Sequence, residues 1–233
     1  MMKRWEELPE AMQTEAVRPY YEALWNKRGA LLAKRVFDVT VAALMLFVLL
    51  PVFLILAILI KLDSPGPVFY RQERVTTYGE RFRIFKFRTM CQNADKIGTA
   101  VTVNGDARIT RVGRFLRRCR LDEISQLLNV LDGTMTFVGT RPEVPKYVAA
   151  YTPEMMATLL LPAGITCEAS VRYKDESRLL DNAEDADAVY VNEVMPGKMR
   201  YNLRAILAFS FWGDIKIMFM TVFAMFGKDY SQD

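Results

Sequence analysis

RLDEISQLLNVL, residues 120–131, places two adjacent acids at the start of a predicted helix. Four apolar side chains recur at helical spacing and predict one buried face: Leu121, Ile124, Leu128 and Leu131. Asp122 and Glu123 fall in the first turn, where free backbone N–H groups and the helix dipole favour negative charge. Because an α-helix has about 3.6 residues per turn, these two carboxylates are expected to point about 100° apart and toward different targets.

Cations lie on both sides of the acidic pair. Upstream are Arg108, Arg111, Arg114, Arg117, Arg118 and Arg120. Downstream, residues 134–138 predict a strand that ends at GTRP, residues 139–142. Two carboxylates among cations fit a phosphoryl-transfer site, with one acid as nucleophile and the other holding a divalent metal. The alternative is a plain helix start, and spacing alone favours it because acids open many helices.

Composition narrows the chemistry that this chain can perform. Its 233 residues suffice for one sizeable domain with appendages, and its net charge of +4 is mild. The absence of histidine excludes His general bases, His-dependent triads and His metal ligands. Any metal is therefore expected to be a hard cation held by oxygen atoms, and Mg²⁺ is the ion we expect. Three widely spaced cysteines predict reduced thiols facing a cytoplasm: Cys91, Cys119 and Cys167.

Residues 39–60 carry no charge and are long enough for a membrane helix. At ~1.5 Å rise per residue the segment is roughly 33 Å long, about the thickness of a bilayer core. Pro51 lies near its middle and predicts a kink, because proline removes a backbone hydrogen bond. Both flanks are basic, with Lys34 and Arg35 before the segment and Lys61 after it, as in a hairpin that enters and leaves by one face. The residues alone leave a spanning helix and a re-entrant helix equally open.

The segment before this helix, residues 1–33, is polar with interspersed aromatic side chains. A helical stripe is formed by Val17, Tyr20, Tyr21 and Leu24. Trp25 beside Lys27 and Arg28 suits a membrane interface, and a plain packing helix is the equal alternative.

Two strands and a connecting turn are predicted after the apolar segment. The strands cover residues 68–75 and 81–88, and residues 76–80 join them as a hairpin. Lys86 and Arg88 stand at the end of the second strand, where they are candidates for binding phosphate. The alternative for these cations is an ordinary charged edge strand.

The remaining segments carry weaker signals. Residues 91–107 predict a polar loop or short helix, and residues 144–161 a helical stretch that restarts at Pro153. Residues 162–166 predict a turn followed by an extended segment, and residues 175–187 a solvated acidic face, with a metal-binding loop as the alternative. Residues 202–227 predict two amphipathic helices that lie in a membrane interface. The last stretch is apolar but interrupted by Arg204, Asp214 and Lys216, which argues against a membrane span.

Several motifs occur in a fixed order along the chain. They are KRxFD at 34–38, GPVF at 66–69, KFRTM at 86–90, LDExxQL at 121–127, NVL at 129–131, GxRP at 139–142 and GIT at 164–166. With these motifs the chain closely resembles the bacterial sugar transferase family, the monotopic polyprenyl-phosphate phosphoglycosyl transferases typified by the small enzyme of Campylobacter N-glycosylation. The resemblance covers about residues 34–226.

The resemblance implies a reaction and roles for the site residues. A sugar-1-phosphate would pass from a UDP-sugar to undecaprenyl phosphate with release of UMP, starting a lipid-linked glycan for exopolysaccharide, O-antigen or glycoprotein synthesis. Asp122 would be the nucleophile that forms a covalent phosphosugar, with Mg²⁺ bound by Asp122 and its metal-linked partner Glu123. Arg88, Arg117 and Arg141 fall where the family places cations that bind phosphate and nucleotide. The candidates from the residue pattern add two more substrate-binding cations, Lys86 and Arg114.

The resemblance also implies an α+β architecture in three parts. Residues 1–33 would be an amphipathic extension, residues 34–61 a re-entrant, kinked membrane helix, and residues 62–233 a small α/β catalytic domain with a β-hairpin and interfacial C-terminal helices. The expected location is the bacterial cytoplasmic membrane, with the active site on its cytoplasmic face.

The chain departs from the family pattern at three places. Leu50 precedes Pro51 where the family often has serine, and Thr140 precedes Arg141 where the family has proline. After GIT the usual Gly-Trp-Ala-Gln is replaced by CEAS at 167–170. The family's downstream arginine has two candidate matches, Arg172 and Lys174. These departures bear on which sugar is used, and the sequence names neither the sugar nor the pathway.

Two other classes of protein compete with the enzyme. A non-catalytic membrane-anchored scaffold would keep Pro51 and the amphipathic tail and would use the acidic pair only to cap a helix. A nucleic-acid binder would use the arginine cluster, but the apolar segments and the few basic residues elsewhere argue against a nucleic-acid partner. The expected partners are UDP-sugar, undecaprenyl phosphate and membrane lipid, and a homodimer is left open.

Overall fold

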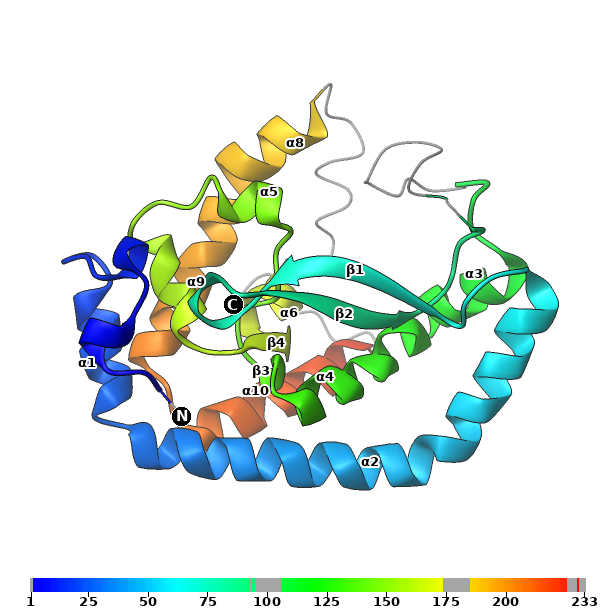
Figure 1. Cartoon of the computed structure of the whole chain (residues 1–233), viewed down its shortest axis with the longest axis horizontal. Helices are drawn as coiled ribbons and strands as arrows, with labels where there is room; N and C mark the ends of the chain where they lie inside the picture. The colour runs from blue at the N-terminus through cyan, green and yellow to red at the C-terminus, as the bar shows by residue number, and fades with distance from the viewer. Residues whose placement is uncertain (1, 93, 95–105, 174–184, 226–229, 231–233) are drawn as a thin grey trace.

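A single helix of 36 residues, α2 (Arg28–Asp63), runs along one edge of the molecule, and the other elements lie to one side of it (Figure 1). The computed structural model describes residues 2–92, 94, 106–173, 185–225 and 230. The predicted loop at 91–107 and the acidic segment at 175–187 lie largely outside these residues, and Lys174 lies wholly outside them.

The fold mixes helices with two small sheets, as the predicted α+β class requires. In chain order the elements are η1 (Trp5–Glu7), η2 (Glu10–Met12), α1 (Arg18–Trp25), α2, β1 (Phe69–Val75), η3 (Thr77–Gly79), β2 (Arg81–Phe87), α3 (Arg111–Arg118), η5 (Leu121–Gln126), α4 (Leu127–Asp132), β3 (Met135–Val138), α5 (Pro145–Val148), η6 (Met155–Leu160), β4 (Ala163–Thr166), α6 (Glu168–Arg172), α8 (Ala186–Val189), the π-helical turn η7 (Tyr190–Val194), α9 (Met195–Leu207) and α10 (Phe211–Met225).

The apolar helix α2 is longer than the predicted 34–61 segment and continues through Pro51. Its ribbon changes direction in the C-terminal half (Figure 1). Among the described residues it is the one helix long and apolar enough to cross a membrane, judged by length and composition. It ends at Asp63 because Ser64 is extended (φ −159°, ψ 148°) and Pro65 has no N–H with which to continue the helix.

The predicted hairpin is confirmed. β1 and β2 pair antiparallel in a register that runs from Phe69 opposite Phe87 to Val75 opposite Arg81. Phe82 and Ile84 are buried in one hydrophobic cluster and Phe87 in another, so β2 packs apolar side chains on both of its faces.

The predicted strand at 134–138 and the extended segment after Pro162 are also confirmed, as β3 and β4, which pair in parallel. Just beyond β3, Gly139 approaches Gly164 of β4 closely, since a Cβ on Gly164 would lie 2.1 Å from the Gly139 carbonyl oxygen. Only glycine fits there. This contact fixes the path of the chain into Thr140 and Arg141, where the N–H of Gly164 donates to the Thr140 carbonyl over 2.8 Å.

The stretch at 120–131 is helical, and the predicted buried face is only partly correct, because Leu121 and Ile124 pack partly buried against the core but the stripe does not continue to Leu131. Its first half, η5, is a 3₁₀-helix, and only its second half, α4, is an α-helix. A 3₁₀-helix turns about 120° per residue instead of 100°, so the later residues are rotated relative to the predicted stripe. The inward side chains are Ser125, Gln126, Leu127, Asn129 and Val130, whereas Leu131 is 37% exposed.

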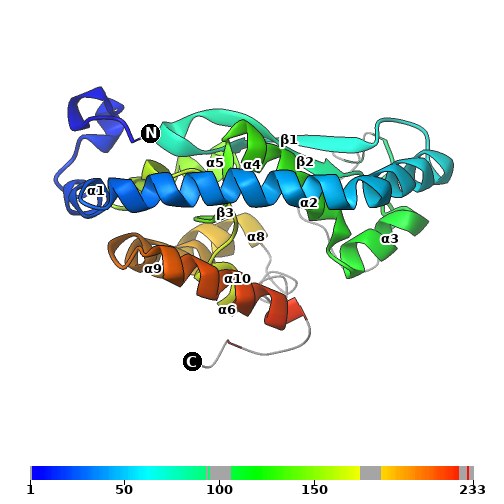
Figure 2. The same ribbon diagram turned by 90° about the horizontal axis from the view of Figure 1, so that it is seen from below.

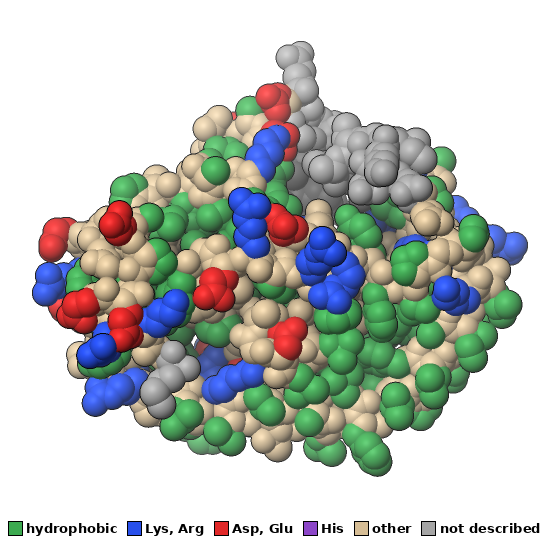
Figure 3. Space-filling model, viewed as in Figure 1, with side chains coloured by type: hydrophobic (Ala, Val, Ile, Leu, Met, Phe, Trp, Pro, Cys, Tyr) green, Lys and Arg blue, Asp and Glu red, His purple; other side chains and the backbone are tan. Residues whose placement is uncertain are grey.

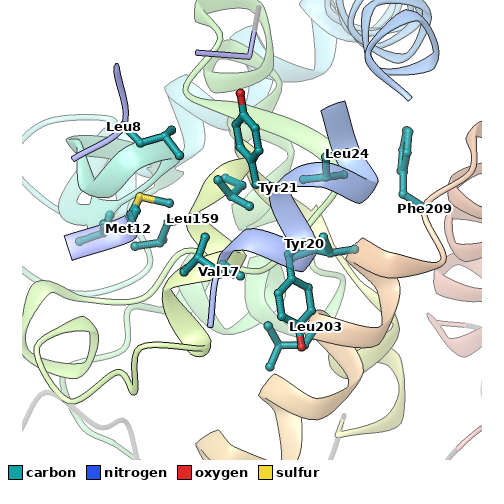
Figure 4. Packing of buried hydrophobic residues seen from close by; sticks show 13 residues of the cluster. Leu8, Met12, Val17, Tyr20, Tyr21, Leu24, Leu159, Leu203 and Phe209 are labelled. Carbon is teal, nitrogen blue, oxygen red and sulfur yellow. The ribbon is translucent and has the colours of Figure 1, made fainter. Parts of the chain in front are cut away.

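The N-terminal segment packs into the protein core. The stripe Val17, Tyr20, Tyr21 and Leu24 is buried against side chains that include Leu159 and Leu203 (Figure 4). The packing alternative for this stripe is therefore the observed one.

The two predicted C-terminal helices are confirmed as α9 and α10, although α9 begins at Met195 rather than at 202. The predicted helical stretch over 144–161 is reduced to the short helices α5 and η6. Views from below place α10 beside α2 (Figure 2), and the two helices are in contact.

Large apolar side chains are exposed on both α2 and α10. On α2 they include Phe47, Val48 and Leu62, and on α10 they include Trp212 and Phe219. Figure 3 shows hydrophobic side chains gathered along the edge formed by α2. This exposed area is far more apolar than a soluble surface requires.

A cluster of charged and polar side chains joins α2 to α10 and β3. We name Lys34, Asp38, Asp214 and Thr136 the Lys34 cluster. The Lys34 ammonium lies 2.7 Å from Asp214 and 3.6 Å from Asp38, and the Thr136 hydroxyl donates to Asp38. All four side chains are largely buried. Sequence reasoning singled out Asp214 only as a break in an apolar stretch.

Candidate active site

Three charged side chains from separate elements meet at Glu123. We name Lys86, Glu123 and Arg141 the Glu123 cluster. The Lys86 ammonium donates to Glu123 Oε1 over 3.0 Å, and Arg141 donates to Oε1 over 2.8 Å and to Oε2 over 3.3 Å. Lys86 belongs to β2, Glu123 to η5, and Arg141 follows β3. Three residues predicted from the sequence therefore lie together.

Asn129 explains why η5 lies beside the strand that bears Lys86. Its buried side-chain oxygen accepts the Phe85 N–H of β2 over 2.8 Å, and its amide donates to Thr134 Oγ1 over 3.1 Å. An outward-facing backbone N–H of a two-stranded sheet is thereby satisfied by a side chain from α4. Arg35 of α2 caps the other end of α4 by donating to the Val130 carbonyl over 2.6 Å.

The charges of the Glu123 cluster stabilise one another. Burial alone would raise the pKa of Glu123, but Arg141 and Lys86 outweigh it and hold that pKa well below its usual range. Glu123 in turn raises the pKa of the Arg141 guanidinium. Arg141 is held from a second side as well, because it donates to the Ile165 carbonyl over 3.0 Å. Glu123 is thus a fixed anion that orients two cations.

Asp122 differs from its neighbour. Among the described residues, no other residue donates a hydrogen bond to its carboxylate. Burial and the charge of Glu123 raise the pKa of Asp122, while Lys86 and Arg117 act to lower it. Since η5 is a 3₁₀-helix, adjacent side chains point about 120° apart rather than the 100° expected for an α-helix. The expected divergence of the two carboxylates therefore holds, and Asp122 is the one left open to a ligand.

The backbone just before the pair is strained. Arg120 adopts a left-handed conformation (φ 56°, ψ 20°), which is unfavourable for a side chain with a Cβ. This residue lies between α3 and η5 and so sets the direction in which the chain enters the turn that carries Asp122. Strain of this kind is common where function fixes geometry.

The predicted substrate cation Arg88 is placed differently. Its buried guanidinium donates to the carbonyl oxygens of Ser64 over 2.7 Å and of Pro65 over 2.8 Å, and to that of Ile60 over 3.2 Å. The Ser64 and Pro65 carbonyls follow the last residue of α2, whereas the Ile60 carbonyl also accepts the Ser64 N–H over 3.2 Å. Arg88 therefore joins the end of α2 to the end of β2 instead of joining the Glu123 cluster.

The other predicted cations are dispersed. Arg117 lies near enough to Asp122 to lower its pKa and donates to Thr89 Oγ1 over 3.0 Å. Arg114 is exposed on α3, and its side chain has no hydrogen bond or ion pair within the described part of the chain. Arg172 pairs with Glu168 at 2.9 Å and lies over the Tyr201 ring.

The donor set for a metal is small. Among the described residues, no group of three or more His, Cys, Asp or Glu side chains is arranged to hold an ion. Asp122 offers an uncommitted carboxylate, whereas both oxygens of Glu123 are engaged by cations. Mg²⁺ is commonly bound by one or two carboxylates together with substrate phosphates. The residues present therefore fit Mg²⁺, with Asp122 as the protein ligand.

A cavity of about 260 Å³ lies at the C-terminal ends of β3 and β4. Its walls include Thr140, the residue before Arg141, together with Cys167, Asn202 and Lys216. Ligand pockets for drug-sized molecules are roughly 300–1,000 Å³, so this one is suited to a smaller group than a whole nucleotide sugar.

Glu143, two residues after Arg141, was not singled out by sequence reasoning. Its side chain is largely buried and accepts a hydrogen bond from the Tyr190 hydroxyl. The available signal was an acid directly following Arg-Pro at the end of a strand.

Comparison with known proteins gives one consistent result. A family model described as bacterial sugar transferase matches residues 29–228. The chain is 36% identical over 207 residues to a UDP-N-acetylgalactosamine-undecaprenyl-phosphate N-acetylgalactosaminephosphotransferase of Aeromonas hydrophila, covering 84% of this chain and 46% of that one.

Two UDP-glucose:undecaprenyl-phosphate glucose-1-phosphate transferases are similarly close. The Escherichia coli K12 protein is 36% identical over 222 residues, covering 93% of this chain and 45% of its own length. The Caulobacter vibrioides protein is 39% identical over 201 residues, covering 85% of this chain and 71% of its own length. This chain thus spans about half the length of the first two relatives.

Proposed function

The chain belongs to the bacterial sugar transferase family, and on that premise we propose that it transfers a sugar-1-phosphate from a UDP-sugar to undecaprenyl phosphate, releasing UMP. The observation that carries the proposal is the meeting of Lys86, Glu123 and Arg141 beside the open carboxylate of Asp122. Oriented cations next to a carboxylate without a partner suit attack on a diphosphate.

We propose a two-step reaction at Asp122. A carboxylate oxygen of Asp122 attacks the β-phosphorus of the UDP-sugar, and the bond from that phosphorus to the bridging oxygen breaks, so UMP leaves with the electron pair. A phosphate oxygen of the lipid then attacks the same phosphorus, and the Asp122 carboxylate is released unchanged. The covalent route spares two anionic substrates from meeting directly.

The remaining residues of the cluster have supporting roles in this proposal. Arg141 presents a planar guanidinium suited to two parallel hydrogen bonds with phosphate oxygens, and Lys86 adds a point charge. Glu123 keeps both cations in place. Mg²⁺, when bound through Asp122 and the substrate, would neutralise charge on the diphosphate.

The location follows from the chemistry of the two substrates. A lipid phosphate and a water-soluble nucleotide sugar meet only at a membrane surface. We propose that α2 is re-entrant, that α10 lies in the interface, and that the site faces the cytoplasm. The exposed apolar side chains of α2 and α10, the charged residues at both ends of α2 and the bend beyond its middle support this placement (Figures 1 and 2).

The topology is tested by cysteine labelling at the two ends of α2. Gly29 and Lys61 are exposed and suitable, whereas Gly66 is not, because its φ of 120° is left-handed and a Cβ there would lie 2.1 Å from Arg88 Nη1. The exposed Cys91 and Cys119 are first replaced by serine. Labelling of both sites from the cytoplasmic side agrees with the proposal, and labelling from opposite sides would establish a spanning helix.

The reaction is tested with a panel of radiolabelled UDP-sugars and undecaprenyl phosphate, followed by solvent extraction of the lipid product. In the absence of lipid, UMP is expected to appear stoichiometrically, with a phosphosugar adduct on the Asp122 peptide by mass spectrometry. UMP that appears only with lipid present, and no adduct, would remove the covalent route. A folded protein that transfers no sugar from the panel would favour the scaffold alternative.

A further inference from the structure

A second group of side chains holds the backbone just after Arg141. It is centred on Glu143, two residues further along the chain. Glu143 accepts a hydrogen bond from the Tyr190 hydroxyl, and its carboxylate lies 3.9 Å from the Lys198 ammonium. Lys198 also donates to the Tyr190 oxygen over 3.1 Å. Glu143 and Lys198 are only 11% and 13% exposed, so these contacts are largely protected from water.

The hydroxyl of Tyr190 reaches Glu143 from an unusual backbone. Tyr190 is the first residue of η7, a π-helical turn between α8 and α9. Such turns are rare overall, and those that occur are often found at functional sites. The ring is held independently of the hydroxyl, because it packs against the Tyr147 ring with centroids 4.6 Å apart. The geometry therefore separates the ring, which packs, from the hydroxyl, which anchors Glu143.

Glu143 also lies close enough to the guanidinium groups of Arg74 and Arg141 for its charge to act on both. Arg74 of β1 donates to the Pro142 carbonyl over 3.1 Å, and the backbone N–H of Val75 donates to the Glu143 carbonyl over 3.0 Å. The charges of Arg74 and Arg141 repel one another, and the charge of Glu143 offsets that repulsion for both. Charges thus alternate from Lys86 through Glu123, Arg141 and Glu143 to Arg74.

We propose that Tyr190 and Glu143 are positioning residues that fix Arg141 for binding the phosphates of the nucleotide. The inference rests on the proposed function and extends it to residues outside the acidic pair. Removal of the Tyr190 hydroxyl loosens Glu143, so Arg74 and Arg141 are no longer held apart by a fixed anion. The guanidinium of Arg141 then samples positions that do not match the phosphate.

The test compares Tyr190→Phe with Tyr147→Phe in the full chain. Both changes remove one hydroxyl and keep the stacked rings, but the Tyr147 hydroxyl donates to Asp187 rather than to Glu143. With UMP as the probe in calorimetry, Tyr190→Phe is expected to weaken binding about tenfold, and Tyr147→Phe less than about twofold. In turnover assays the Tyr190 variant should raise KM for the UDP-sugar more than it lowers kcat.

A double-mutant cycle separates positioning from general stability. In an Arg141→Lys background, Tyr190→Phe is expected to cost little further UMP affinity, because its target has already been altered. Glu143→Gln, which keeps the acceptor and loses the charge, should behave like Tyr190→Phe. Wild-type UMP affinity in both Tyr190→Phe and Glu143→Gln, or full additivity with Arg141→Lys, would overturn the inference. A wild type that binds UMP but transfers no sugar contradicts the proposed function alone, since the binding data still decide the positioning role.

Discussion

The Lys34 cluster and the Glu123 cluster contain the same kinds of side chain and differ in what they leave open. In the Lys34 cluster one ammonium lies between two carboxylates, and a hydroxyl donates to one of them. In the Glu123 cluster two cations lie on one carboxylate, and the preceding residue, Asp122, has a carboxylate to which no other described residue donates a hydrogen bond. The charges of the Lys34 cluster pair with one another and join elements, although Lys34 and Asp214 also line the cavity. The Glu123 cluster instead places an excess of cations beside an acid that is available to an anionic ligand.

The largest expected effect is that of Asp122→Asn, which tests whether the open acid beside the Glu123 cluster is the nucleophile. The change removes a carboxylate to which no other described residue donates and leaves the three charges of the Glu123 cluster in place. Transfer into lipid is expected to fall by at least about 10⁴-fold, as on loss of a nucleophile, with little change in thermal unfolding. Radiolabelled transfer and differential scanning fluorimetry measure the two effects. Retention of more than a tenth of wild-type turnover would show that the carboxylate is not the nucleophile.

Lys34→Met tests the other cluster. Its loss leaves the buried carboxylates of Asp38 and Asp214 without a counter-ion, which is expected to cost about 3–5 kcal/mol of stability. Thermal unfolding in detergent measures the loss. The matched control is Lys61→Met, an exposed lysine of the same helix, which should change stability by less than about 0.5 kcal/mol. Equal effects of the two variants would mean that the buried cluster does not join α2 to α10.

Arg141→Lys sharpens the comparison within the Glu123 cluster. A lysine keeps the charge and an ion pair to Glu123 but loses the planar pair of donors, so kcat/KM for UDP-sugar is expected to fall about 100-fold. The assay is initial-rate transfer at low UDP-sugar. Arg81→Lys, on the exposed hairpin, is the control and should turn over normally. Wild-type rates for Arg141→Lys would mean that only the positive charge at this position matters, and not the planar pair of donors.

The smallest expected effect concerns the strained residue before the acidic pair. Arg120→Gly should raise stability by about 0.5–1 kcal/mol, because glycine accepts the left-handed conformation without strain. The control Arg118→Gly, in the last turn of α3, should lower stability by about 1 kcal/mol. Thermal unfolding of both variants decides the matter, and a loss of stability in Arg120→Gly would mean that the arginine side chain outweighs the strain.

Local patterns predicted the hairpin, the strand at 134–138, the apolar helix and the paired C-terminal helices, because each depends on side-chain periodicity or a turn signal. The buried face of the 120–131 helix differs in part from the predicted stripe because its first half is a 3₁₀-helix and because Asn129 points inward to pair with β2, a contact between segments far apart in sequence. The contacts of Arg88 with the end of α2 could not be predicted, because a basic residue at a strand end has the same sequence pattern whether it binds a substrate or the carbonyls of a helix end. Tyr190 and Glu143 were not foreseen because nothing local connects positions 47 residues apart.

The contact between Arg88 and the end of α2 has a mechanical consequence. Arg88, which directly follows β2, donates to the carbonyls of Ile60, Ser64 and Pro65, so the end of α2 is tied to the strand that carries Lys86. With α2 in the bilayer as proposed, the depth of the helix sets the height of the site. Each ångström by which it rises or sinks moves the Lys86 end of the site by about as much, so the height of the chemistry above the lipid is built into the chain.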